Sequence, residues 1–263
     1  MQMNIPQKQA GQYAVVNNLK IYYEVYGNGR PFVLLHGGGS TIQSTFGRII
    51  PELAKSHKVI AVELQAHGHT LDIDRPLSFE QDADDVAELI RNLHIDKADF
   101  MGFSNGGTTC LQIAIRHPEI VNKLILASTN YKREGMPPGF FDGFQHATLD
   151  NMPVQLKEAY LQANPDLHGL QRMFERDVAR MKDFKDISDE EIKNIHSPVF
   201  VINGDKEVVL AEHAFKLSRM LPHAILAILP GGHGDYIGEL CAADKNSNIP
   251  FLVTAMIEDF LRQ

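Results

Sequence analysis

The chain has 263 residues, of which 44% are hydrophobic and 22% charged, a composition typical of a folded globular protein rather than a disordered or fibrous one. Its formal net charge of −8 argues against nucleic-acid binding, which needs a dense basic face. No stretch approaches the roughly 18 consecutive apolar residues of a membrane span, and two cysteines are too few for a disulfide framework. We therefore expect a cytoplasmic protein with neither nucleic-acid nor membrane partners; the composition leaves its oligomeric state open.

Short apolar runs alternate with helix-period segments along the chain. Residues 13–16 and 20–26 predict an opening hairpin around Asn17-Asn18, since Asn tolerates the positive φ of tight turns. Six further runs are almost entirely apolar, as in strands buried on both faces: 32–35, 59–62, 100–103, 124–126, 199–202 and 225–229. Helices are predicted from Ser78, over 210–221 and over 251–261. The alternation indicates an α/β fold with a mostly parallel central sheet flanked by helices.

One segment, residues 131–195, breaks this rhythm. It separates two predicted strands by far more chain than a single crossover helix needs, and it is rich in apolar residues at helical spacing. We therefore expect a core made of residues 1–130 and 196–263, with residues 131–195 inserted as a helical cap. The cap residues either line a hydrophobic substrate pocket or only pack the cap onto the core.

The strongest local motif is Gly102-Phe103-Ser104-Asn105-Gly106, which lies directly between a predicted strand and a predicted helix. A nucleophile elbow requires a serine at such a sharp turn, because small neighbours relieve crowding and the hydroxyl then projects from the sheet edge. The following helix N-terminus favours developing negative charge. Ser104 is therefore our candidate nucleophile.

A serine hydroxyl needs a base to take its proton, and that base needs an acid to orient it. His233 follows the last predicted strand in Pro230-Gly231-Gly232-His233-Gly234, at the sheet edge where Ser104 also emerges. Two carboxylates, Asp205 and Glu207, follow the preceding strand, and the residues alone leave open which of them orients His233.

An oxyanion formed by attack of Ser104 needs backbone donors. His36-Gly37-Gly38-Gly39 follows the strand predicted over residues 32–35, and its lack of side chains lets the backbone approach a substrate. We expect the N–H groups of Gly38 and Asn105 to form the oxyanion hole.

The chain resembles the α/β-hydrolase fold superfamily, in particular its serine esterases and lactonases. The resemblance covers essentially the whole chain, and the motifs occur in the same order. The resemblance rests on five segments: His36 to Gly39, Glu63 to Gly68, Gly102 to Gly107, Gly204 to Glu207, and Gly232-His233. In similar members the acid commonly stands three residues after the glycine that ends its strand, which implies Glu207, although most members have Asp there. Residues 63–68 depart from the common D-x-R-G-H-G pattern, and the resemblance implies that they support the oxyanion loop.

The resemblance implies a serine hydrolase that cleaves a carboxylic ester, lactone or thioester of a small hydrophobic substrate through an acyl-enzyme, with no cofactor and no metal. Fold alone does not choose a reaction. A non-catalytic ligand-binding protein on the same fold, and a lyase or haloperoxidase-like enzyme with the same triad, remain alternatives.

We expect structural roles for the other polar residues that could suggest a site. His67 and His69 lack a third ligand cluster that would make them a metal site. Arg172, Arg176 and Arg180 recur at helical spacing, and we expect a solvated face of the cap there rather than a site for an acidic substrate.

Overall fold

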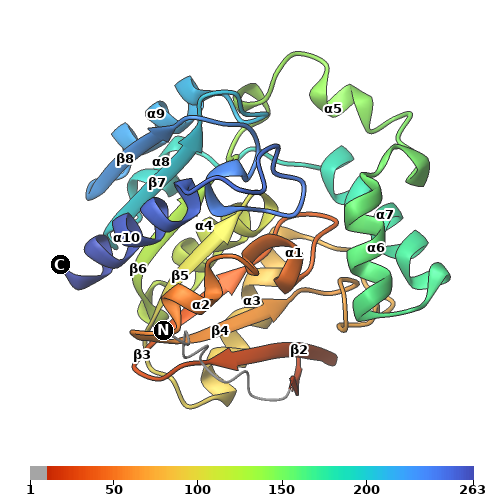
Figure 1. Cartoon of the computed structure of the whole chain (residues 1–263), viewed down its shortest axis with the longest axis horizontal. Coiled ribbons are helices and arrows are strands. Elements are labelled where there is room, and N and C mark those ends of the chain that lie inside the picture. The colour runs from red at the N-terminus through yellow and green to blue at the C-terminus, as the bar shows by residue number, and fades with distance from the viewer. Residues whose placement is uncertain (1–10) are drawn as a thin grey trace.

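A computed structural model describes residues 11–263, so residues 1–10 of the predicted core lie outside the described residues. Eight strands within this range form one sheet (Figure 1). They are β1 Gln12–Val16, β2 Leu19–Tyr26, β3 Arg30–Leu35, β4 His57–Glu63, β5 Ala98–Phe103, β6 Val121–Ala127, β7 Val199–Gly204 and β8 Ala224–Leu229. Each of the six apolar runs and both arms of the predicted hairpin lie in these strands.

The strands are ordered β1-β2-β4-β3-β5-β6-β7-β8. Only β2 pairs antiparallel, with β1 and with β4, and the remaining neighbours are parallel. The hairpin turns at Asn17 and Asn18, whose φ angles of 47° and 67° are those that Asn tolerates. The predicted fold class, an α/β fold with a mostly parallel sheet, is confirmed.

Helices cover both faces of the sheet because side chains alternate across each parallel strand. Val33 belongs to the apolar cluster under α3, α4 and α9, whereas its neighbour Leu34 belongs to the cluster under α1, α2 and α10. These helices are α1 Ile42–Phe46, α2 Ile50–Leu53, α3 Phe79–Asn92, α4 Asn105–Arg116, α9 Ala211–Met220 and α10 Ile249–Arg262, with short 3₁₀ turns η1 Pro118–Ile120 and η4 Asp235–Ile237. Among residues 11–263, none of the helices is long and apolar enough to span a membrane.

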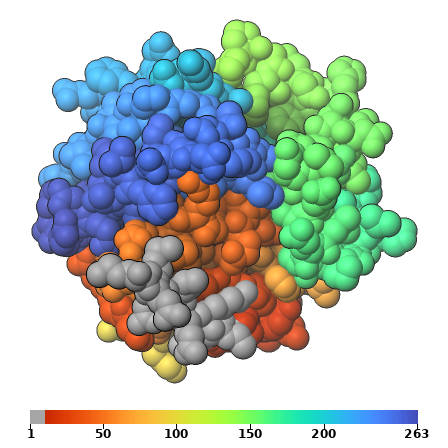
Figure 2. All heavy atoms as spheres, viewed as in Figure 1, coloured from red at the N-terminus to blue at the C-terminus, as the bar shows by residue number. Residues whose placement is uncertain are grey.

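The chain between β6 and β7 is helical. It contains η2 Arg133–Gly135, α5 Phe140–Gly143, η3 Leu149–Asn151, α6 Val154–Ala163, α7 Leu167–Lys182 and α8 Asp189–Lys193. Helices α5 to α7 form a block along one side of the molecule (Figures 1 and 2), attached through two small apolar clusters that include Phe79 and Ala66 of the core. Both ends of the segment differ, because Tyr131 at its start and Ile187, Ile192 and Ile195 at its end join the main core cluster. Only the part around α5 to α7 therefore packs on the core through the two small clusters.

Candidate active site

Ser104 occupies a sharp turn between β5 and α4, with φ 54° and ψ −121°. The flanking glycines are required by close backbone contacts. A Cβ on Gly102 would lie 2.1 Å from the Gly106 carbonyl oxygen, and one on Gly106 would lie 2.2 Å from that of Leu35. A strained, glycine-flanked turn of this kind exposes the serine side chain at the carboxyl edge of the sheet, as a nucleophile elbow does.

His233 lies beside the elbow and is held by Glu207. Its ring packs on Phe103, the residue before Ser104, with centroids 4.6 Å apart. Its Nδ1 lies 2.7 Å from Glu207 Oε2. Because a carboxylate can only accept, Nδ1 carries the proton of the neutral ring and Nε2 keeps a free lone pair. This is the tautomer that can take a proton from a serine.

Glu207 is buried, with 1% of its side chain exposed. Burial alone would raise the pKa of Glu207, but the hydrogen bond and charge of His233, the Ser128 hydroxyl and the Val208 N–H outweigh it and lower the pKa below the ordinary value. Glu207 is therefore ionised at neutral pH, as the orienting acid of a histidine must be.

Asp205, the other candidate acid, has a different task. Its Oδ1 accepts the Gly231 N–H at 2.7 Å, and its own N–H donates to the Leu229 carbonyl at 2.8 Å. These bonds tie the turn after β7 to the loop that carries His233. The structure thus brings Glu207, rather than Asp205, to the imidazole.

The ionised state of Glu207 predicts a pH-dependent contribution to stability. Because its pKa is lower in the folded protein, the contribution is present above the unfolded-chain value of about 4.3 and is lost as the pH falls through the folded value. The difference in free energy of unfolding between wild type and Glu207→Gln, measured with urea, should therefore shrink as the pH is lowered from about 6 to about 3. A constant difference would mean that Glu207 is not held as a carboxylate.

The candidate oxyanion residues lie around the same cavity as Ser104 and His233. Asn105 is the first residue of α4, so its N–H has no partner within the helix. Gly38 passes close by: a Cβ on it would lie 2.5 Å from Asn105 Nδ2. Gly38 and Asn105 therefore border the place where an oxyanion on a Ser104 adduct would form.

Ser128 is a site residue that the sequence did not single out. It follows β6 with φ 47°, its hydroxyl donates to Glu207 Oε1, and it is hydrogen-bonded in turn to the buried Tyr236 hydroxyl. Glu207 is thus held on both carboxylate oxygens. The available signal was its position, since the carboxyl ends of parallel strands meet at one edge of the sheet.

The cavity has a volume of about 430 Å³ and is mostly apolar. The insertion supplies most of its wall: Met136, Phe140, Phe144, Met152, Leu156, Met173, Phe174, Val178, Met181 and Phe184. Among the described residues that line it, none is Lys or Arg, and Asp177 is the one carboxylate. The wall of the cavity is therefore mostly hydrophobic, as in many small-molecule sites.

Two neighbouring cap phenylalanines provide a matched test of this lining. Phe144 lines the cavity, whereas Phe141 is buried behind it against Phe184 and the Arg133 guanidinium. Phe144→Ala should change the ratio of kcat/KM between hexanoyl and butyryl p-nitrophenyl esters by about threefold or more. Phe141→Ala should lower stability by about 3 kcal/mol and leave this ratio unchanged. If both variants lose stability and neither moves the ratio, the phenylalanines only pack the cap.

The histidines of the loop after β4 contact different carboxylates. His69 donates through its backbone N–H to Glu63 Oε2 at 2.6 Å, and its Nδ1 lies 2.9 Å from the same oxygen. His67 Nε2 lies 3.0 Å from Asp177 Oδ2 on the cap. His69 thus pairs with a carboxylate at the end of β4, and His67 with a carboxylate of the cap.

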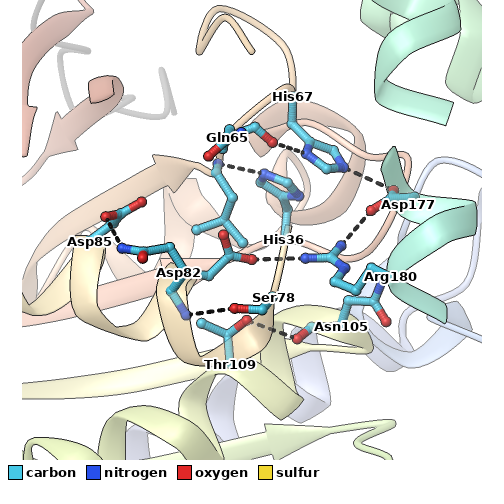
Figure 3. A network of polar contacts seen from close by, with 12 residues as sticks. His36, Gln65, His67, Ser78, Asp82, Asp85, Asn105, Thr109, Asp177 and Arg180 are labelled. Carbon is cyan, nitrogen blue, oxygen red and sulfur yellow. Dashed lines mark hydrogen bonds and ion pairs between the residues drawn. The ribbon is translucent and has the colours of Figure 1, made fainter. Parts of the chain in front are cut away.

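The expected solvated arginine face is wrong for one of its three members. Arg172 and Arg176 are partly exposed and pair with Asp166 and Asp72. The Arg180 side chain is only 3% exposed and pairs with Asp82 and Asp177 (Figure 3). The helical spacing could not predict the burial of Arg180, because its partner Asp82 lies on α3, far away in the sequence.

A model of the alpha/beta hydrolase fold family matches residues 30–172. The 2-hydroxymuconate semialdehyde hydrolase of Pseudomonas sp. (strain CF600) is 33% identical over 132 residues, which make up 47% of this chain and 46% of that relative. The chain thus spans about half of that relative's length. The human serine hydrolase BPHL is 25% identical over 82% of this chain and 77% of its own. The meta-cleavage product hydrolase from Pseudomonas fluorescens IP01 has the same fold, with a TM-score of 0.79 at 21% identity over 96% of this chain and 97% of that one. Since the family model matches more than half of the chain, this protein belongs to the alpha/beta hydrolase fold family.

Proposed function

We propose that this protein is a serine hydrolase that cleaves an ester-like bond of a small, uncharged, hydrophobic substrate. The observation that carries the proposal is the pairing of His233 with the buried Glu207, on a ring that borders the same apolar cavity as Ser104. The similarity to hydrolases, including one named a serine hydrolase, supports it.

The proposed reaction proceeds through an acyl-enzyme. Ser104 Oγ attacks the carbonyl carbon while His233 Nε2 takes the hydroxyl proton, and the carbonyl oxygen becomes an oxyanion bound by the Gly38 and Asn105 N–H groups. The C–O bond to the leaving group then breaks, and His233 returns the proton to that oxygen. Water deprotonated by His233 attacks the acyl-enzyme next, releasing the carboxylic acid and regenerating Ser104. Glu207 remains ionised throughout and stabilises the transient imidazolium.

The charge of the cavity wall supports an uncharged substrate. An ester, lactone or thioester with an aliphatic acyl group buries no charge. A substrate with a second, free carboxylate would bury that charge against apolar side chains, with no Lys or Arg among the described lining residues.

A second candidate is hydrolysis of a carbon–carbon bond, which the similarity to 2-hydroxymuconate semialdehyde hydrolase favours. The same residues would serve it, with His233 delivering a proton to carbon. The substrate of that relative carries a carboxylate, however, and the cavity described above offers it no counter-charge.

A pair of substrates of equal length tests this proposal. p-Nitrophenyl hexanoate and mono-p-nitrophenyl adipate differ mainly in the terminal carboxylate of the acyl chain. We expect kcat/KM to favour the hexanoate by about tenfold or more, because the adipate must bury a charge, and we expect no turnover of 2-hydroxymuconate semialdehyde. Preference for the adipate, or turnover of the semialdehyde alone, would contradict the proposed substrate class. The Ser104→Ala variant supplies the background rate.

A further inference from the structure

A carboxylate of the cap reaches into the oxyanion loop. Asp177 lies in α7, yet its Oδ2 accepts the N–H of Gly39 at 2.6 Å. The same oxygen lies 3.0 Å from His67 Nε2 and would lie 3.3 Å from a Cβ on Gly38. Asp177 thus sits against the peptide that joins Gly38 to Gly39, 138 residues away in the chain.

The other oxygen of Asp177 binds Arg180, one turn later on α7. Arg180 in turn donates to Asp82 Oδ2 of α3 at 2.8 Å, and both of these side chains are almost fully buried. Figure 3 shows the resulting chain of contacts from His67 through Asp177 and Arg180 to Asp82. The end of α7 is therefore fastened to the core on two sides, at the loops beside the oxyanion hole and at α3.

His67 is the imidazole of this cluster whose charged form the Asp177 carboxylate favours. Its Nδ1 lies 2.9 Å from the Gln65 carbonyl, and its Nε2 lies 3.0 Å from Asp177 Oδ2 and 3.3 Å from the Gly39 nitrogen. Burial would lower the pKa of His67, but the Asp177 carboxylate raises it above the ordinary value. His36 beside it is neutral, because its Nδ1 faces the Gly37 carbonyl and its Nε2 accepts the Leu64 N–H.

Asp177 therefore lies between the Arg180 guanidinium and His67, whose charged form it favours. An isolated carboxylate at this place would oppose the formation of an oxyanion nearby. The Arg180 charge compensates that of Asp177, so that the carboxylate can hold an N–H group of the loop with less of that penalty.

The glycines of the oxyanion loop explain why the hydrogen bond from Gly39 to Asp177 matters. Gly37, Gly38 and Gly39 have no side chains that could fix their dihedral angles, and glycine is the residue with the greatest backbone freedom. An oxyanion hole works only when its donors are already oriented before the charge develops. A hydrogen bond at Gly39 restricts the peptide next to the candidate donor, Gly38.

We propose that Asp177 is a positioning residue that orients the oxyanion loop from the cap, so that the oxyanion hole is competent only while α7 is docked. This proposal rests on the serine hydrolase function proposed above. Asp177 acts through Gly39 and Gly38 and takes no part in bond making. Displacement of α7 would release the Gly39 N–H and allow the three glycines to relax.

The test compares Asp177→Asn and Asp177→Ala with Glu175→Gln, an exposed position on the same helix whose side chain bonds only to Gln171 among the described contacts. Hydrolysis of p-nitrophenyl hexanoate separates kcat from KM. Asp177→Ala should lower kcat by about 10-fold to 100-fold, less than the loss of an oxyanion donor itself, and leave KM within about threefold. Asp177→Asn keeps one acceptor oxygen and should fall between Asp177→Ala and wild type, whereas Glu175→Gln should match wild type.

An inhibitor pair provides a readout that a merely structural role would not move. A hexyl trifluoromethyl ketone forms an oxyanion adduct with serine, whereas the matching alkyl amide binds only in its ground state. The inhibition constant of the ketone should rise in parallel with the loss of kcat/KM in both Asp177 variants, and that of the amide should stay unchanged. Asp177→Asn carries the test if Asp177→Ala does not fold.

Two results would overturn the inference while leaving the proposed function intact. One is a folded Asp177→Ala variant with wild-type kcat or, where that variant does not fold, an Asp177→Asn variant with both wild-type kcat and wild-type ketone inhibition, in an enzyme whose wild type hydrolyses esters. The other is an equal weakening of ketone and amide binding together with a lower Tm, which would show a purely structural role. If wild type itself hydrolyses no ester and forms no ketone adduct, the proposed function fails instead.

Discussion

Replacing Ser104 with alanine is expected to lower kcat for p-nitrophenyl hexanoate by a factor of about 10⁴ or more. Ser104 supplies the attacking oxygen, and its removal leaves only the orienting and oxyanion groups to act on the ester. Alanine is smaller than serine, and a φ of 54° strains its backbone no more than that of serine. The turn should therefore remain intact. The measurement is steady-state hydrolysis by protein whose circular dichroism spectrum and Tm match those of wild type.

A folded Ser104→Ala variant that kept more than about a tenth of the wild-type kcat would remove Ser104 from the mechanism. The rate must be corrected for contaminating esterases, which a parallel preparation from cells carrying an empty vector provides. A fall in KM with unchanged kcat would be equally contrary, since Ser104 is assigned to chemistry and not to ground-state binding.

Replacing Glu207 with glutamine is expected to lower kcat by a factor of about 10² to 10⁴. The glutamine keeps the shape of the side chain but can present an NH₂ group to His233 Nδ1. The imidazole would then carry its proton on Nε2, the nitrogen that has to accept the Ser104 proton. KM should change little, because Glu207 is buried beneath the ring and holds it through Nδ1.

Asp205→Asn is the matched control, since it also replaces a carboxylate in the turn after β7. Asp205 binds the Gly231 N–H rather than the imidazole, so its loss should lower Tm more than it lowers kcat. The assignment of the acid would reverse if Asp205→Asn proved more damaging to kcat and Glu207→Gln were near neutral. Both variants are compared well below their Tm, on protein whose circular dichroism spectrum matches that of wild type.

The sheet and the elbow could be predicted because their signals are local. A run such as residues 32–35 is apolar at every position, and that pattern is typical of a strand covered on both faces, whatever lies elsewhere in the chain. Gly102 likewise marks a close backbone contact with Gly106, on the other side of Ser104. Fold class and the order of the candidate site residues followed from such features.

Contacts between distant segments could not be predicted in the same way. Ser128 and Glu207 are 79 residues apart, and no spacing rule links a serine after β6 to a glutamate after β7. Arg180 was expected on a solvated helix face, and its burial beside Asp177 depends on how the end of α7 lies over α3 and the oxyanion loop. The choice between Asp205 and Glu207 needed the resemblance to known hydrolases, because both carboxylates follow the same strand.

Covalent labelling with a fluorophosphonate probe reports directly whether Ser104 is an activated nucleophile. Such a probe reacts with a serine that has a working base and oxyanion hole, and not with the serines of a binding protein on the same fold. We predict stoichiometric labelling of native wild-type protein, with the adduct mapped to Ser104 by peptide mass spectrometry. Heat-denatured protein and Ser104→Ala should remain unlabelled, and His233→Ala should label far more slowly. Failure of native protein to label, or an adduct on another residue, would contradict the assignment of Ser104 as nucleophile.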